Sequence, residues 1–208
     1  DGIFLSDSSN NIIANNTISN NRYYGICLDD YSSENIIANN TFLLNGMFVS
    51  KSYNNTVSNN TVNGKPLVYL ENVNGYVVGY AGQVIAINSN NITVENLNIS
   101  YASVGIEFWN TSNGKIINNT VSNNYCGIWL EASSNNIIAN NNVSNNFYGI
   151  VPDYSSNNTI ANNTFHLNGM LVLESYDNTV VNNTVNGKPL VLSLIHISEP
   201  TRPRLTSY

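Results

Sequence analysis

A repeat of about 22 residues runs through most of the chain, and it restricts the fold more than any other feature of the sequence. Five copies open with Gly-Ile, as in GICLDDYSSEN at Gly25 and GIWLEASSNN at Gly127. The nine visible copies begin at Gly2, Gly25, Met47, Leu67, Val84, Gly105, Gly127, Gly149 and Met170. A chain of this kind is expected to stack copies of one small unit rather than to wrap a single unique core.

Within a copy, asparagine recurs every five residues. Asn11, Asn16 and Asn21 keep this spacing, and Ile13 and Ile18 follow two residues after the first two. The spacing is not helical, and the short segments between the asparagines alternate apolar and polar residues. Short segments of period two, rich in β-branched residues and separated by Asn, Ser and Gly, are typical of strands joined by tight turns.

One copy is too small to bury its own apolar residues, so the copies must stack into a solenoid. Asparagine occupies 44 of the 208 positions, interleaved with apolar residues at fixed offsets, which argues against a disordered polar segment. Asn tolerates the left-handed backbone of tight turns, and stacked Asn side chains can hydrogen-bond along the stack. We therefore predict an all-β parallel β-helix, or solenoid, of about nine coils of roughly 22 residues that stack into a rod.

The pattern GI-x-L-x-x-SS-x-N-x-I-x-x-N-x-I-x-x-N resembles the right-handed parallel β-helix of the NosD-like family, also called the carbohydrate-binding and sugar-hydrolase (CASH) repeat. The segment from Gly64 to Ser100 is similar to one found in archaeal surface proteins of that family. The resemblance covers residues 2–191. It implies an extracellular or cell-surface location, and it leaves the activity open because the family includes enzymes, accessory proteins and surface proteins.

A longer repeat lies over the short one. NTVNGKPLV occurs at Asn60–Val68 and again at Asn183–Val191, and each copy closes a unit. After the first copy, the coil at residues 67–83 is short, and we expect its glycines Gly75, Gly79 and Gly82 to lie at bends.

After the second copy the repeat stops, and residues 192–208 resemble a translated transposon-end adapter from a sequencing library. We therefore expect two parts: a β-helix fragment truncated at both ends at residues 1–191, and a non-native tail at residues 192–208.

The charge excludes some partners. The chain has 7 Lys and Arg against 13 Asp and Glu, for a net charge of -6, and no basic patch of the kind that nucleic acid requires. No apolar run approaches the 18 or so residues of a membrane span, so we predict none in this fragment.

Two columns of side chains are expected to face solvent on the first strand of each coil, because alternate residues of a strand point to opposite faces. The first column is expected to hold Phe4, Cys27, Val49, Tyr69, Ala86, Glu107, Trp129, Val151 and Val172. The second is expected to hold Ser6, Asp29, Lys51, Glu71, Asn88, Trp109, Glu131, Asp153 and Glu174.

These columns bring aromatic rings and carboxylates together on one face. Aromatic rings stack on the apolar faces of sugars, while carboxylates accept hydrogen bonds from their hydroxyls. The sequence therefore predicts a carbohydrate site made of Tyr69, Glu107, Trp109, Trp129, Glu131 and Asp153.

Two classes of function remain open. The first is a non-catalytic structural or adhesive module that binds cell-surface or extracellular polysaccharide on this face. The alternative is a glycoside hydrolase or lyase that uses the same carboxylates, since glycoside hydrolysis employs a pair of them. We favour the first and assign no catalytic residue.

The chain shows no dedicated metal site. Stacked Glu131, Asp153 and Glu174 could hold Ca²⁺ through oxygen ligands, although nothing resembles a calcium-binding loop. The resemblance links the chain to copper-enzyme maturation, but copper favours clustered Cys, Met and His. Here Cys27 and Cys126 are expected to lie about four coils apart, too far for a disulfide. We therefore assign no cofactor.

Overall fold

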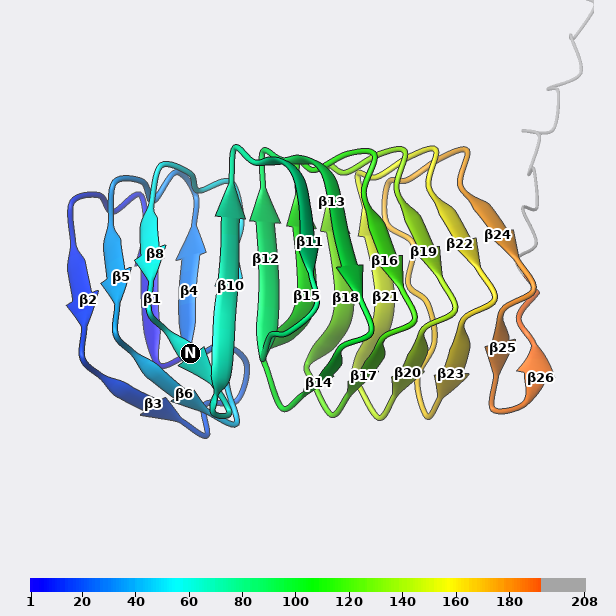
Figure 1. The fold of residues 1–208 in the computed structure, drawn as a ribbon, viewed down its shortest axis with the longest axis horizontal. Coiled ribbons are helices and arrows are strands. Elements are labelled where there is room, and N and C mark those ends of the chain that lie inside the picture. The colour runs from blue at the N-terminus through cyan, green and yellow to red at the C-terminus, as the bar shows by residue number, and fades with distance from the viewer. Residues whose placement is uncertain (192–208) are drawn as a thin grey trace, which may run out of the picture.

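The computed structural model describes residues 1–191 and contains only strands and turns within that range. Its strands form parallel ladders that run from coil to coil, as the predicted parallel β-helix requires (Figure 1). Among these residues, no helix has the length and hydropathy needed to cross a membrane. The prediction for residues 192–208 lies outside the described residues.

The first three coils form an N-terminal block, residues 1–62, with three strands per coil. Its first sheet contains β1 (Ile3–Ser6), β4 (Ile26–Asp29) and β7 (Met47–Val49). Its second contains β2 (Ile12–Ala14), β5 (Ile36–Ala38) and β8 (Thr56–Ser58). The third side of each coil is formed by β3 (Thr17–Ser19), β6 (Thr41–Leu43) and β9 (Thr61–Val62).

The remaining coils form a C-terminal block, residues 65–191. Its first side contains β10 (Lys65–Glu71), β12 (Gln83–Ile87), β15 (Val104–Trp109), β18 (Cys126–Glu131) and β21 (Tyr148–Asp153). Its second contains β11 (Asn74–Val78), β13 (Asn90–Glu95), β16 (Lys115–Ile117), β19 (Ile137–Ala139), β22 (Thr159–Ala161) and β24 (Thr179–Val181). Its third contains β14 (Asn98–Ser100), β17 (Thr120–Ser122), β20 (Asn142–Ser144), β23 (Thr164–His166), β25 (Thr184–Val185) and β26 (Lys188–Pro189).

The core lies inside the coils and is built from the apolar residues of the repeat. Ile106 and Phe108 of β15 stack on Ile128 and Leu130 of β18, and all four are fully buried. These are the inward positions that the alternation predicts. Burial of such columns supplies most of the stabilisation, because one coil alone cannot remove them from water.

Adjacent asparagines in each turn have different roles. Asn140 has a positive φ of 57° and is exposed, whereas Asn141 is buried and joins a ladder. The Asn141 side chain accepts from the Asn119 backbone N–H at 2.9 Å, and its own amide donates to Asn163 Oδ1 at 2.9 Å. The predicted Asn ladder and the predicted left-handed turn residues are both confirmed, at neighbouring positions.

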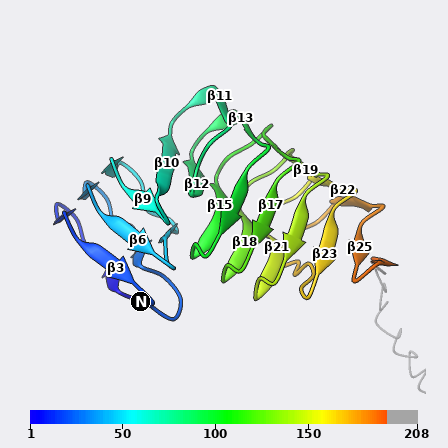
Figure 2. The ribbon, with the colours of Figure 1, turned by 60° about the horizontal axis from the view of Figure 1, so that its bottom comes forward.

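The coils do not stack into one continuous rod, because the chain reverses between the two blocks. Asn63 and Gly64 both have positive φ, 51° and 79°, as a two-residue hairpin turn requires. As a result β10 pairs antiparallel with β9, and parallel with β12, instead of stacking on β7. Figure 2 shows the first three coils lying at an angle to the later ones, with β10 and β11 between them.

Among the glycines expected at bends, Gly82 is required by a close approach. A Cβ at Gly82 would lie 2.2 Å from the Val62 carbonyl oxygen, whereas a Cβ at Gly79 would meet nothing within 4 Å. Gly75 has a φ of 77°, which suits glycine. The short coil is therefore the place where the rod turns.

Candidate functional site

The reversal leaves one edge of β7 without a following strand, and side chains of the C-terminal block cover it. Ser103 Oγ accepts from the Gly46 N–H at 2.9 Å and donates to the Gly46 carbonyl at 3.0 Å. The Gln83 amide accepts from the Met47 N–H at 2.9 Å and donates to the Met47 carbonyl at 2.6 Å. We call this contact between the two blocks the junction.

A carboxylate completes the junction. Glu107 is 1% exposed, and its Oε1 accepts from the Val49 N–H at 3.1 Å. Its Oε2 has no partner among the described residues. Burial raises the pKa of Glu107 well above its ordinary value, nearby Glu131 raises it further, and the bond from Val49 opposes both. The neutral form of Glu107 is therefore favoured.

A second apolar cluster, separate from the coil core, fills the junction. Phe48 stacks on Tyr24 at 4.6 Å between ring centroids and meets Trp129 edge-on at 5.7 Å. Its buried members are Cys27, Phe48, Val104, Cys126 and Val151. Much of the face that was expected to meet solvent is thus covered by the first three coils.

The structure places Tyr69, Glu107 and Trp129 on one side of the C-terminal block, with Glu107 buried and Tyr69 and Trp129 half-buried. Glu107 and Trp129 are opposite each other in the ladder, and Trp129 Nε1 has no partner among the described residues. The Tyr69 hydroxyl donates to Glu71 at 2.9 Å, and burial raises its pKa. Glu107 is thus covered by the N-terminal block, and the ligand-binding role of the three residues stays a prediction.

Trp109, Glu131 and Asp153 form a line at the ends of β15, β18 and β21, and all three are half-buried. The Trp109 ring stacks against Tyr53, with centroids 6.4 Å apart. Glu131 Oε1 accepts from the Ser50 hydroxyl at 3.2 Å. Burial is the main reason that the pKa values of Glu131 and Asp153 are raised; Glu174 adds to the effect at Asp153.

The expected columns contain register errors of one residue. Cys27 is opposite Phe48, so Phe48 points outward and Val49 belongs to the coil core. Glu107 and Trp109 are opposite Ile85 and Ile87, in place of the expected Ala86 and Asn88. Asp153 is bridged to Leu173 rather than to Glu174. The six predicted site residues still lie on the outward side of their strands. Glu174, however, is not in register with Asp153, so the predicted acidic stack of Glu131, Asp153 and Glu174 does not form.

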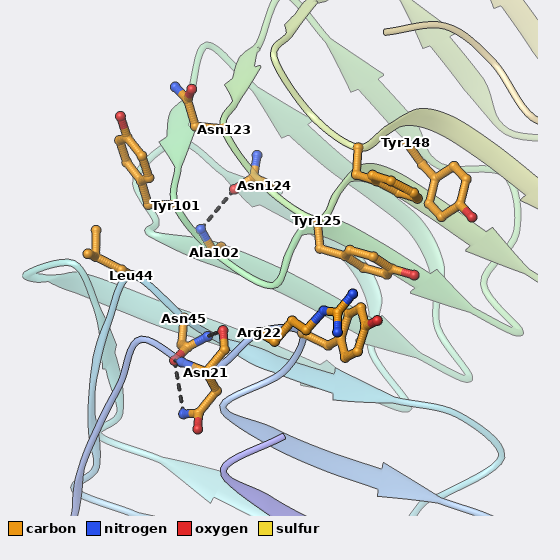
Figure 3. A pocket seen from close by; sticks show the side chains of 12 residues that line it. Asn21, Arg22, Leu44, Asn45, Tyr101, Ala102, Asn123, Asn124, Tyr125 and Tyr148 are labelled. Carbon is orange, nitrogen blue, oxygen red and sulfur yellow. Dashed lines mark hydrogen bonds between the residues drawn. The ribbon is translucent and has the colours of Figure 1, made fainter.

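Sequence reasoning missed an aromatic pocket of about 540 Å³ between the two blocks. The N-terminal block contributes Asn21, Arg22, Tyr23, Leu44 and Asn45. The C-terminal block contributes Tyr101, Ala102, Asn123, Asn124, Tyr125, Phe147 and Tyr148 (Figure 3). Asn45 and Asn124 belong to Asn ladders: Asn45 Oδ1 accepts from Asn21, and Asn124 Oδ1 from the Ala102 N–H. The pocket is therefore built on rigid coils.

Tyr125 is the centre of the aromatic pocket. Its ring stacks on Phe147 at 5.5 Å and meets Tyr23 and Tyr148 edge-on at 5.2 Å and 5.6 Å. Burial, followed by the neighbouring tyrosines, raises the pKa of Tyr125. The Arg22 guanidinium lies 5.1 Å from the centroid of Tyr23. None of the pocket-lining residues is acidic.

The sequence held a signal for this pocket. An aromatic residue comes just before the first strand in RYYGI, NYCGI and NFYGI, at Tyr23, Tyr125 and Phe147. Aromatics at one repeat position lie side by side in neighbouring coils. What the repeat could not show was that Tyr23, from a distant coil, faces Tyr125 across the junction.

The described residues do not fit a copper site. Cys27 and Cys126, expected in distant coils, both join the junction cluster and are free. Burial raises the pKa of Cys27 to about 12 and that of Cys126 as well, which disfavours the thiolate that binds metals. Across residues 1–191, no three His, Cys, Asp or Glu side chains are grouped to hold a metal ion.

Two family models match the chain. One, described as "Periplasmic copper-binding protein (NosD)", matches residues 64–199, and the other, described as "Right handed beta helix region", matches residues 1–78. No curated protein and no solved structure matches it. The similarity to archaeal surface proteins stays a prediction. Since the first model spans more than half of the 208 residues and the fold agrees with both, the chain belongs to the NosD family of parallel β-helix proteins.

Proposed function

We propose that this protein is an envelope or cell-surface β-helix module that binds carbohydrate in the aromatic pocket of the junction. The observation that carries the proposal is the pocket of about 540 Å³ and its cluster of Tyr23, Tyr125, Phe147 and Tyr148. The location is supported by the family, which is described as periplasmic. The stacked coils suit a structural or adhesive role, because they form a stiff support for the site.

The chemistry of the pocket favours a sugar over a purely apolar ligand. Tyrosine rings offer faces for the C–H groups of a sugar ring and hydroxyls for its polar edge. Asn21 and Asn123 add amides at the rim, and Arg22 is the one basic residue that lines the pocket. The volume lies within the roughly 300–1,000 Å³ of ligand pockets.

A glycan array tests this proposal. Phe147 is 70% exposed, so Phe147→Ala removes a stacking surface with little effect on the fold. Tyr154→Ala is the matched control, because Tyr154 is 67% exposed and does not line the pocket. We expect the array signal of the unaltered chain to fall at least tenfold in Phe147→Ala, about 1.4 kcal/mol, and to persist in Tyr154→Ala. Absence of any glycan signal would leave a structural spacer as the function.

The predicted site at Trp109, Glu131 and Asp153 is a second candidate for the same ligand class. These residues lie in one register line and are half-buried rather than covered. Trp109→Ala in the same array distinguishes the two sites. If it abolishes the signal while Phe147→Ala does not, the sugar binds on the line of carboxylates.

A polysaccharide-active enzyme remains the competing function, favoured by one observation. Glu131 and Asp153 are neighbours on adjacent parallel strands, and the pKa values of both are raised, as an acid catalyst requires. Neither lines the aromatic pocket. Release of reducing sugar that is lost in Glu131→Gln would favour the enzyme over the binding module.

Calcium at Glu131 and Asp153 stays a prediction. Burial is the main cause of the raised pKa values of both groups and disfavours their charged forms, which are the forms that bind a divalent cation. Calorimetric titration with CaCl₂ at pH 7, repeated on Asp153→Asn, tests it.

A further inference from the structure

The edge of β7 that the junction covers has a second copy in the chain. Residues 169–178 resemble residues 46–55 in sequence, and their backbone hydrogen bonds to the preceding coil are alike. The Gly149 N–H donates to the Gly169 carbonyl at 3.0 Å, as the Gly25 N–H does to Gly46 at 2.8 Å. The hairpin is reproduced too, since β25 pairs antiparallel with β26 as β9 does with β10. We call residues 169–173 the second edge.

The two copies differ in whether another part of the chain covers them. Gly46, Met47 and Val49 are buried, and their N–H groups donate to Ser103, Gln83 and Glu107. On the second edge, Met170, Leu171 and Val172 are only half-buried, and Leu173 is 37% exposed. Within residues 1–191, the N–H groups of Gly169, Met170 and Val172 have no acceptor.

Gly46 and Gly169, at equivalent positions of the two copies, differ in the space around them. A Cβ at Gly46 would lie 2.4 Å from Gln83 Oε1 and 3.1 Å from the Ser103 backbone nitrogen, so a side chain there would displace the covering residues. A Cβ at Gly169 would meet nothing within 4 Å, and the φ of Gly169 is not positive. The preceding Asn168 has both amide atoms buried without a partner among the described residues. Gly169 thus fits an edge that another surface approaches closely.

We propose that the second edge docks a further β-helix block that presents Gln, Ser and Glu in the arrangement of Gln83, Ser103 and Glu107. The N–H groups on this edge have the same spacing as those of β7, so the same three side chains would satisfy them. The partner is thus a block related to residues 67–191 of this chain.

The side chains of the second edge define what this block carries around those three residues. Leu171 replaces Phe48, so an apolar side chain is required at the position of Trp129. Glu174 replaces Lys51, which lies close enough to Glu131 to lower its pKa. The charge is therefore reversed, and the block that docks here carries a basic residue at the position of Glu131.

A tandem chain tests the proposal. In it, a second copy of residues 67–191, bearing Glu131→Lys, follows Val191, and hydrogen exchange is measured at Gly169, Met170 and Val172. We expect exchange at these amides to slow at least about tenfold relative to the chain without the second copy. Glu107→Ala in the second copy alone should restore fast exchange at Val172. Val49, held by the first copy's Glu107, is the internal control for folding.

Two results would overturn the proposal. Fast exchange at all three amides in a tandem chain whose Val49 is protected means that no block docks on the second edge. Protection at Val172 that survives Glu107→Ala in the second copy means that the next coil stacks directly, as in a straight rod.

Discussion

At the scale of single residues, two adjacent asparagines have different roles in turns such as the one at Asn140 and Asn141. Asn140 adopts the left-handed conformation, whereas Asn141 fills its hydrogen-bonding capacity inside the coil. The amide of Asn141 donates to the Ile116 carbonyl at 2.8 Å and to Asn163, and its oxygen accepts twice from Asn119. The ladder satisfies backbone groups that the turns leave unpaired, which is why asparagine predominates at these positions.

Replacement of a ladder asparagine should be costly. Asn141→Ala leaves the Asn119 N–H and the Ile116 carbonyl unpaired in the interior, at about 1–3 kcal/mol each. We expect the free energy of unfolding in urea to fall by about 3 kcal/mol. Asn142→Thr, at the adjacent exposed position, should change it by less than about 0.5 kcal/mol. Equal losses in both variants would contradict the role of the ladder.

Glu107 should make the stability of the junction depend on pH. Its pKa is raised in the folded protein, so over the interval above the ordinary pKa of Glu the native state binds a proton that the unfolded chain has lost. Stability therefore falls as the pH rises towards the raised pKa. Glu131 and Asp153, also raised, contribute in the same direction. We expect Glu107→Gln to reduce the loss in melting temperature between pH 5 and pH 8, and an unchanged slope would argue against it.

At the scale of the strands, the two-residue turn at Asn63 and Gly64 determines the architecture. It sends β10 back along β9 and frees the edge of β7 for the junction. Gly82 permits this arrangement, because its position against the Val62 carbonyl leaves no space for a side chain.

A pair of glycine substitutions measures this requirement. Gly82→Ala places a methyl group against the Val62 backbone, which should cost about 1–3 kcal/mol of unfolding free energy and expose the Met47 amide to exchange. Gly79→Ala has open space and should be neutral within about 0.5 kcal/mol. Denaturation of the two variants side by side provides the comparison, and a tolerant Gly82 would mean that β10 is not held against β9.

The coil, its inward residues and the Asn ladder were predictable, because each is fixed by contacts one repeat apart. The predicted columns of outward-facing residues were wrong in the coils whose turns differ in length. Asn21 bonds Asn45, 24 residues on, whereas Cys27 is opposite Phe48, 21 residues on, so the turn before β7 is three residues shorter than the turn before β4. The junction and the pocket were not predictable from the repeat, since they join coils that a one-dimensional stack keeps apart. The Asn63-Gly64 pair was a hairpin signal that the repeat pattern concealed.

At the scale of the whole molecule, the chain is two short solenoids joined along a face rather than one rod. Phe48 connects them, since it packs on Tyr24 of its own block and on Trp129 of the other. The same contact holds Tyr23 opposite Tyr125, so the aromatic pocket depends on the junction.

The junction can be weakened without altering the coils. Phe48→Ala should cost about 3–5 kcal/mol, as for buried Phe in general. Phe4→Ala, in the same outward column but 56% exposed, is the control and should be nearly neutral. We expect small-angle scattering to show a larger radius of gyration for Phe48→Ala alone, with slow exchange retained at Ile138. Loss of protection at Ile138 would show instead that the blocks do not fold independently of the junction.

The contacts of the junction also determine the order in which parts of the chain fold. Ladder bonds between neighbouring coils of the C-terminal block span 22 residues, whereas the bonds to Gly46, Val49 and Ser50 span 57, 58 and 81. Neighbouring coils can form in sequence from any nucleus at little entropic cost. The bonds across the junction close much longer loops of chain, so they form slowly. We therefore expect refolding in two phases, with strand signals first and burial of Trp129 second. Until the second phase ends, the protein has nearly all its secondary structure but no aromatic pocket.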